Sequence, residues 1–147
     1  MSFRYAIEGI ISAIRSEKHL RFHIVIANLI CVFAYFYGIS KAEWAVLLLC
    51  IFAVISAELF NTAIERAVDT ATSEIKPLAK ISKDASAGAV LVLCVGAILV
   101  GVCLFGDFTK IGITLIHIFT SVRILVPCLV LGILDIVFLV FGGKNDR

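Results

Sequence analysis

Long apolar stretches, separated by short polar segments, fill most of this chain. They cover residues 22–37, 45–57 and 85–105, and a further apolar region runs from 111 to 141. A helix over 45–57 is only about 20 Å long, whereas the hydrocarbon core of a bilayer is about 30 Å thick. We therefore extend the first span back through residues 20 and 21, and the second forward to about residue 64. The pattern predicts an all-α polytopic membrane protein.

Residues 2–20 have a different pattern, with apolar and polar residues on opposite faces of one helix. The apolar face contains Phe3, Ile7, Ile10, Ile11 and Ile14. The polar face contains Arg4, Glu8, Ser12 and Arg15. This segment is too charged to cross a bilayer, so we expect an amphipathic helix lying along the membrane surface. A helix that packs on a partner outside the membrane is the alternative.

The second half of the chain predicts a polar loop over 70–83 and a third span over 85–105, with Ser82 as its N-cap. A turn follows at 106–110. Residues 111–141 are too long for one span, and they contain Arg123 and Pro127. We expect a short interfacial segment near 111–121 and a fourth span near 123–141. Asp135 is ionisable at membrane depth, and both a structural and a functional role are open for it.

Composition agrees with a membrane protein: 61% of the 147 residues are hydrophobic and the mean hydropathy is +1.09. A soluble domain is about 45–50% apolar. The net charge of +2 does not suggest a nucleic-acid partner. The cysteines all lie in apolar runs without a CxxC motif, which indicates helix-packing residues rather than a disulfide scaffold or zinc site. They are Cys31, Cys50, Cys94, Cys103 and Cys128.

Lysine and arginine predict the orientation of the spans. They gather in the N-terminal segment 4–21 and in segment 66–83, and Lys144 and Arg147 follow near the C-terminus. The intervening turns carry Lys41 and Lys110, with Arg123 near the second turn. An even number of spans would therefore place both termini and the polar loop in the cytoplasm.

Four polar residues follow the second apolar run at spacings of 3, 4 and 4: Glu58, Asn61, Glu65 and Asp69. On a helix they fall within an arc of about 80°. Carboxylates are costly in a membrane and mark candidate functional sites. The predicted topology places this face just below the cytoplasmic surface.

Carboxylates beside lysine and asparagine at such a surface fit a metal–nucleotide site, because Mg²⁺ takes oxygen ligands from carboxylates and substrate phosphates. Phosphoryl transfer also needs a cation on the phosphates and a group that orients or deprotonates the nucleophile. Glu17, Glu58, Glu65 and Lys83 are the candidates. The motifs GxxxxGK[ST] and GxGxxG are absent, which excludes the soluble nucleotide-binding folds.

Two other interpretations are open from the residues alone. The polar groups can be ordinary helix-packing residues that pair with one another, as Glu58 with Lys83 or Glu65 with Arg66. They can also belong to a small ion channel or proton-coupled module. The depth of the carboxylates argues against conduction, because three of the four predicted spans have no charge in their central part.

Three motifs, in order along residues 3–106, strongly resemble the prokaryotic diacylglycerol kinase family of small membrane lipid kinases. They are Tyr5-x-x-x-Gly9 with Glu17-x-x-x-Arg21-x-His23, Glu58-x-x-Asn61-Thr-Ala-Ile-Glu65-x-x-x-Asp69, and Lys83-Asp84-x-x-Ala87-Gly88-Ala89-Val90-Leu91. The amino-acid sequences of the second and third motifs are similar to those of the Gram-positive branch, whose members act on undecaprenol.

The resemblance implies a role for each matching residue. Glu58 would be the general base or the orienting group for the lipid hydroxyl, and Asn61 would position the catalytic carboxylates. Glu17 and Glu65 would hold the divalent metal that bridges the ATP phosphates. Lys83 would contact the γ-phosphate.

Further residues would lie near the nucleotide by the same resemblance: Asp84, Tyr5, and Glu74 to Lys76. The resemblance also implies ATP and Mg²⁺ as cofactors, a lipid alcohol substrate, and a homotrimer with sites shared between protomers. The acceptor would be undecaprenol, with diacylglycerol as the alternative. The location would be the bacterial cytoplasmic membrane, with the active site on the cytoplasmic face.

The chain departs from the family pattern in three places. His19 stands where the family often has asparagine, and Ser82 replaces a common alanine. Residues 107–147 lie beyond the family core, so we divide the chain into a kinase core over 1–106 and a C-terminal extension over 107–147. The extension would add a fourth membrane span, which bears on how protomers pack.

Overall fold

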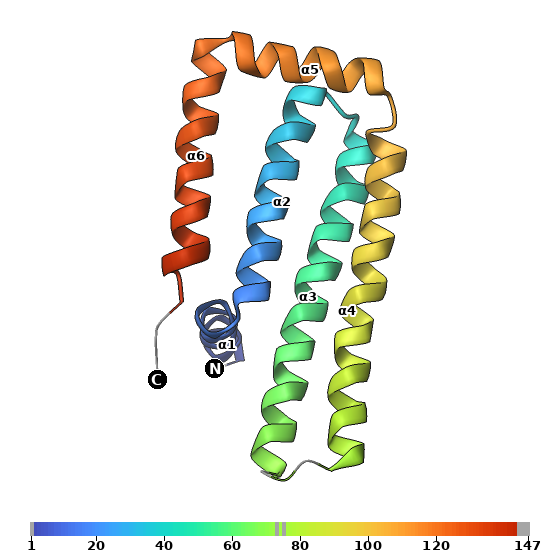
Figure 1. The fold of residues 1–147 in the computed structure, drawn as a ribbon, viewed down its shortest axis with the longest axis vertical. Coiled ribbons are helices and arrows are strands. Elements are labelled where there is room, and N and C mark those ends of the chain that lie inside the picture. Colours follow the sequence, from blue (N-terminus) through green and yellow to red (C-terminus); the bar gives the residue numbers. More distant parts are fainter. Residues whose placement is uncertain (1, 73, 75, 144–147) are drawn as a thin grey trace.

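The structure, a computed structural model, describes residues 2–72, 74 and 76–143, and consists there of six α-helices (Figure 1). Lys144, Arg147 and Ile75 lie outside the described residues. The helices are α1 (Ser2–Ser16), α2 (Lys18–Tyr37), α3 (Lys41–Ala71), α4 (Pro77–Leu104), α5 (Phe108–Thr120) and α6 (Val122–Phe141).

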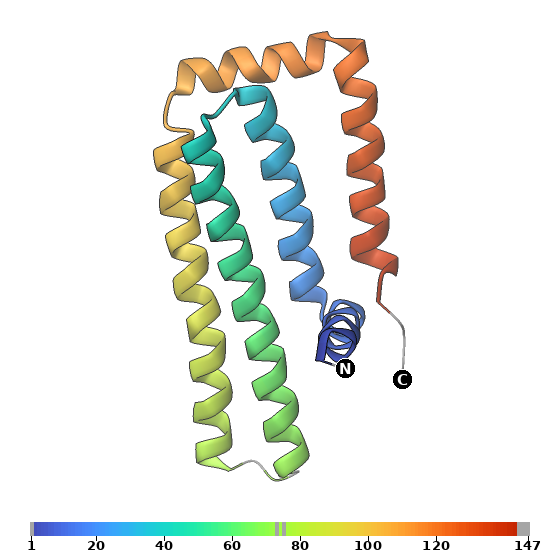
Figure 2. The same ribbon diagram turned by 180° about the vertical axis from the view of Figure 1, so that it is seen from behind.

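Four of these helices, α2, α3, α4 and α6, are long and apolar enough to cross a membrane. They lie side by side in the order α6, α2, α3, α4. The view from behind shows the same neighbours, reversed from left to right (Figure 2). The shorter α5 crosses one end of α2 and joins α4 to α6. The predicted all-α polytopic fold, with a surface helix and four spans, is confirmed.

The end of the bundle away from α5 brings together α1, the α3–α4 connection and the C-terminal end of α6 (Figure 1). An even number of spans predicts this one-sided arrangement. The α3–α4 hairpin extends past α1 at this end, so its connection lies farthest from α5.

The surface helix α1 is shorter than predicted, because the chain breaks at Glu17 rather than at residue 20. Glu17 has extended backbone angles, φ −98° and ψ 113°, and α2 begins at the next residue. In Figure 1 α1 is seen end-on while α2 lies in the plane, so α1 runs across the spans. An amphipathic helix in this direction can lie in the membrane interface.

The predicted loop over 70–83 is wrong, because α3 continues to Ala71 and α4 already begins at Pro77. Proline suits the first turn of a helix, where its missing N–H and fixed φ cost nothing. Ser82 is therefore not an N-cap: it lies inside α4, and its hydroxyl donates to the Leu78 carbonyl. The segment between Ala71 and Pro77 connects the two helices, whereas the polar residues from Lys80 to Lys83 lie in α4.

The apolar residues of this single protomer are mostly exposed, as expected for surfaces that meet lipid or another chain. The buried apolar residues are few: Ala13, Leu20, Val25, Ala34, Tyr37, Leu47, Val54 and Val90. A cavity of about 630 Å³ lies between α2, α3 and α4. Its lining runs from His23, near the start of α2, to Phe105, just after α4.

Candidate active site

Glu58 lies on α3 and is only 7% exposed. A buried carboxylate needs a partner, and His23 of α2 supplies it: its Nε2 lies 3.0 Å from Glu58 Oε1. The imidazole also lines the apolar cavity between α2, α3 and α4. His23 thus lies between the buried carboxylate and an apolar space, at the point where two spans approach each other.

This contact differs from the pairing of Glu58 with Lys83 that one sequence interpretation allowed. His23 was noted only as part of the first motif, and no role was assigned to it. The signal in the sequence is an imidazole that, together with Asn28, interrupts an apolar span. Sequence alone does not pair it with Glu58, because the pairing depends on how α2 is rotated against α3.

Asn61 lies one turn further along α3 and has polar partners on both sides of its amide. Its Nδ2 donates to Glu65 Oε1 at 3.0 Å. Ser86 of α4 lies with its Oγ 2.6 Å from Asn61 Oδ1. A hydroxyl on the oxygen and a carboxylate on the nitrogen fix the orientation of the amide. Asn61 therefore holds the Glu65 carboxylate, and Ser86, which sequence reasoning missed, holds Asn61.

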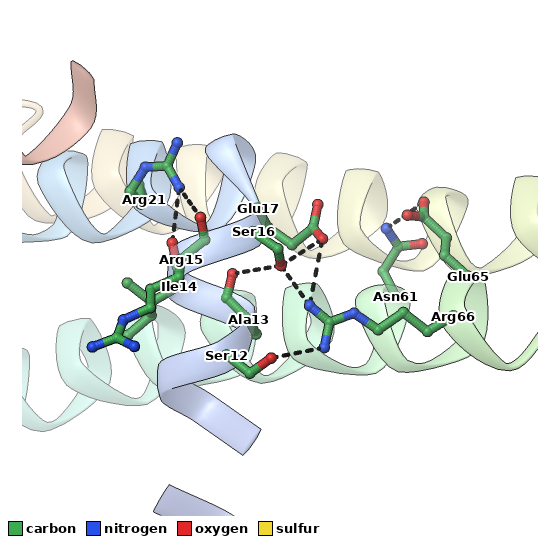
Figure 3. Close-up of polar contacts among 10 residues, drawn as sticks. All are labelled: Ser12, Ala13, Ile14, Arg15, Ser16, Glu17, Arg21, Asn61, Glu65 and Arg66. Carbon is green, nitrogen blue, oxygen red and sulfur yellow. Dashed lines mark hydrogen bonds and ion pairs between the residues drawn. The ribbon is translucent and has the colours of Figure 1, made fainter. Parts of the chain in front are cut away.

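Glu17, at the α1–α2 junction, is tied to α3 through Arg66 (Figure 3). Arg66 Nη2 lies 3.9 Å from Glu17 Oε1 and 2.5 Å from Ser16 Oγ, and Nη1 lies 3.2 Å from Ser12 Oγ. Arg66 follows Glu65 directly in the chain. The two candidate metal ligands thus come from different elements that Arg66 joins, and Arg66 does not pair with Glu65.

Lys83 of α4 donates to Asp69 Oδ1 of α3 across the hairpin at 2.5 Å. Asp69, the last of the four polar residues that follow the second apolar run, is thus the partner of Lys83. The side chain of Lys83 is 36% exposed, so the ammonium group is accessible.

The remaining predicted nucleotide contacts are more dispersed. Glu74 and Lys76 form an ion pair at 3.6 Å in the α3–α4 connection. Tyr5 is exposed on α1 and Asp84 on α4; among the described residues, neither side chain makes a hydrogen bond or ion pair. The structure does not gather all the predicted nucleotide residues around one point within a single protomer.

The chemistry of Glu17 and Glu65 suits Mg²⁺, which accepts one or two carboxylates when substrate phosphates and water complete its shell. Within the described part of the chain, no group of three or more His, Cys, Asp or Glu residues is placed to hold a metal ion. The described residues thus show no metal cage built from protein alone, whereas a site completed by nucleotide phosphates needs only the two carboxylates.

Known proteins with similar sequences identify the family of this chain. The model of the prokaryotic diacylglycerol kinase family matches residues 4–105. The undecaprenol kinase of Bacillus subtilis is 39% identical over 104 residues, which cover 71% of this chain and 85% of that protein. The diacylglycerol kinase of Synechocystis is 38% identical over 105 residues, 71% of this chain and 60% of that protein.

A third relative, the diacylglycerol kinase of Haemophilus influenzae, is 30% identical over 105 residues, 71% of this chain and 89% of that protein. No solved structure is significantly similar to this chain. The family match covers the surface helix and the first three spans, including every candidate site residue. The chain therefore belongs to the prokaryotic diacylglycerol kinase family, and it is a membrane lipid kinase.

Proposed function

We propose that this enzyme transfers the γ-phosphate of ATP to undecaprenol and releases undecaprenyl phosphate and ADP. The observation that carries this proposal is the buried Glu58, whose partner His23 borders an apolar cavity. A lipid alcohol has its hydroxyl at headgroup level and its tail in the apolar region. A base that serves it must lie where polar and apolar surroundings meet.

In the proposed reaction Glu58 accepts the proton of the lipid hydroxyl while the oxygen of that hydroxyl attacks the γ-phosphorus. The bond from the γ-phosphorus to the bridging oxygen breaks, and ADP leaves with the electron pair. Glu58 is suited to this role because His23 orients its carboxylate and burial excludes water. General base catalysis of this kind contributes about 10²–10⁴-fold to rate.

We assign the nucleotide side of the site to Glu65, which accepts a hydrogen bond from Asn61, and to residues of α1, of α4 and of the connections before α2 and α4. Glu17 and Glu65 would hold Mg²⁺, which neutralises phosphate charge when bound. Asn61 donates to Glu65 through its amide; Ser16 Oγ donates to Glu17 Oε1, and Arg66 lies 3.9 Å from the same oxygen. Lys83 would leave Asp69 to meet the γ-phosphate, while Tyr5, Glu74, Lys76 and Asp84 would border the nucleotide.

A homotrimer with shared sites is part of the same proposal. One protomer leaves α4 largely exposed and disperses the predicted nucleotide contacts. A neighbouring protomer would cover this surface, and would bring Glu17 of one chain towards Glu58 of another. The site would face the cytoplasm at the bacterial cytoplasmic membrane, since the basic segments 4–21 and 66–83 lie at that end of the bundle. The channel-like alternative loses its support with the family assignment.

The test is lipid phosphorylation in mixed micelles with labelled ATP and Mg²⁺, run side by side on undecaprenol and diacylglycerol. Diacylglycerol is the comparison because two of the relatives above are named diacylglycerol kinases. We expect a higher kcat/KM for undecaprenol and no label transfer by Glu58→Gln. A higher kcat/KM for diacylglycerol would reverse the acceptor assignment, and no transfer to either lipid would overturn the proposal.

A further inference from the structure

The last helix, α6, is fixed to the first span by a polar contact inside the membrane region. Asn28 Nδ2 of α2 lies 3.0 Å from both Oδ1 and Oδ2 of Asp135. Both side chains are partly buried between the two helices. A carboxylate at this depth is costly without a partner, so the contact fixes α6 in one position against α2.

A second contact joins the C-terminal end of α6 to the surface helix. Arg21, which is only 6% exposed, donates from Nη1 to the carbonyls of Ile14 and Arg15 at 2.9 and 3.1 Å (Figure 3). Its Nε lies 3.4 Å from the carbonyl of Leu139. The final carbonyls of a helix lack partners within the helix and carry partial negative charge. One guanidinium therefore caps α1 and α6 together.

The Arg21 guanidinium can lie close to the chain after α6 because Gly143 has no side chain. A Cβ built on Gly143 would lie 2.8 Å from Arg21 Nη2. Any larger residue would have to displace the guanidinium from the position in which it reaches both helix ends. The small residue after α6 is thus matched to the buried arginine on α2.

These contacts converge on Glu17, which follows the carbonyls that Arg21 binds by only two to three residues. The α1–α2 junction is held on one side by Arg66 from α3, and on the other by Arg21 and the end of α6. We propose that α6, fixed on α2 by the Asn28–Asp135 contact, positions Glu17 for Mg·ATP through Arg21. Asp135 and Arg21 are then positioning residues, and this inference rests on the proposed function of Glu17.

The position of a metal ligand such as Glu17 affects the affinity for the nucleotide more than it affects proton transfer to Glu58. Coupling through a packed element of this kind is worth several-fold in affinity, and up to about 30-fold. We therefore expect Asp135→Leu to raise KM for Mg·ATP about fivefold or more, while KM for the lipid and kcat change less than about twofold.

The experiment compares wild type, Asp135→Leu, Asn28→Asp, and the exchanged pair Asn28→Asp/Asp135→Asn, all as full-length chains in the same micelles. The exchanged pair restores an amide opposite a carboxylate, so we expect wild-type KM for Mg·ATP. Asn28→Asp alone places two carboxylates together and should raise it. Calorimetric binding of a non-hydrolysable ATP analogue with Mg²⁺ should follow the same order without any turnover.

Each outcome decides the inference separately from the kinase assignment. An inactive wild type would overturn the proposed function, while the binding series would still test the effect of α6. An active wild type with equal nucleotide affinity in all four proteins would overturn the role of α6. A loss of kcat or of folded protein that the exchanged pair fails to reverse would also overturn it, since that pattern describes packing alone.

Discussion

His23 Nε2 on α2 lies 3.0 Å from Glu58 Oε1 on α3. The two residues are far apart in the sequence, and the contact brings the first motif of the chain onto the second. Glu58 is the most buried acidic residue of the described chain, and His23 is the polar side chain that satisfies it. The base proposed for the lipid hydroxyl therefore has a fixed orientation before any substrate binds.

Glu58→Gln should lower kcat by at least about 10², because a general base contributes about 10²–10⁴-fold. Nucleotide binding should change little, since the base acts in the transition state. The measurements are kcat in the mixed-micelle assay and binding of a non-hydrolysable ATP analogue. Glu43→Gln, at the opposite end of α3, is the matched control and should keep wild-type kcat. Unchanged turnover in Glu58→Gln would move the base role to another residue.

His23→Leu should lower kcat about 10-fold or more, because a hydrogen bond to a charged group is worth about 1.5–3 kcal/mol. His23→Gln keeps an N–H donor and should lose less. The comparison of the two variants separates orientation of Glu58 from loss of packing in the cavity. Equal losses in both variants would show that the imidazole acts by filling space rather than by holding the carboxylate.

Glu17→Gln and Glu65→Gln should each raise the Mg²⁺ concentration needed for half-maximal activity. Each variant removes one of the two carboxylates that we propose as Mg²⁺ ligands. The measurement is a Mg²⁺ titration at saturating ATP and lipid. Glu8→Gln is the control, because Glu8 lies on the exposed face of α1 and pairs with Arg4. A wild-type titration curve for either variant would remove that residue from the metal site.

Ser86→Ala should lower kcat/KM for ATP by about 5- to 10-fold, since a lost hydrogen bond costs about 1 ± 0.5 kcal/mol and leaves the Asn61 oxygen unpaired. Ser82→Ala removes a hydroxyl from the same helix, but this hydroxyl only bonds back to the Leu78 carbonyl. It should therefore leave kcat/KM unchanged. Equal kinetics in the two variants would contradict a role for Ser86 in holding Asn61.

Ser40→Ala should destabilise the protein by about 1 kcal/mol, which is typical for loss of an N-cap. Ser40 and Glu43 form a reciprocal capping box: the Glu43 N–H donates to Ser40 Oγ at 3.3 Å, and the Ser40 N–H to Glu43 Oε2 at 2.6 Å. The measurement is Tm in detergent micelles. Ser121→Ala is the control, because Ser121 precedes α6 without a side-chain capping bond. A Tm loss as large in Ser121→Ala would contradict the capping explanation.

The sequence predicted the spans well where apolar composition alone decides them. The first, second and fourth spans and the interfacial segment before the fourth all lie where the pattern indicated. The prediction failed for residues 77–83, because their polarity is typical of a loop, whereas Pro77 can begin a helix. Helical hydrogen bonds do not require apolar side chains, so a polar segment beyond the membrane can remain helical.

The all-α membrane fold and the candidate residues are predictable from the sequence alone, as is, from residue spacing, the helix face that carries Glu58, Asn61 and Glu65. These properties follow from local periodicity and composition. Only the tertiary structure decided the partners: His23 for Glu58, Ser86 for Asn61, Asp69 for Lys83 and Asn28 for Asp135. Such pairs depend on the rotation and height of one helix against another, which the packing of side chains along both helices determines together.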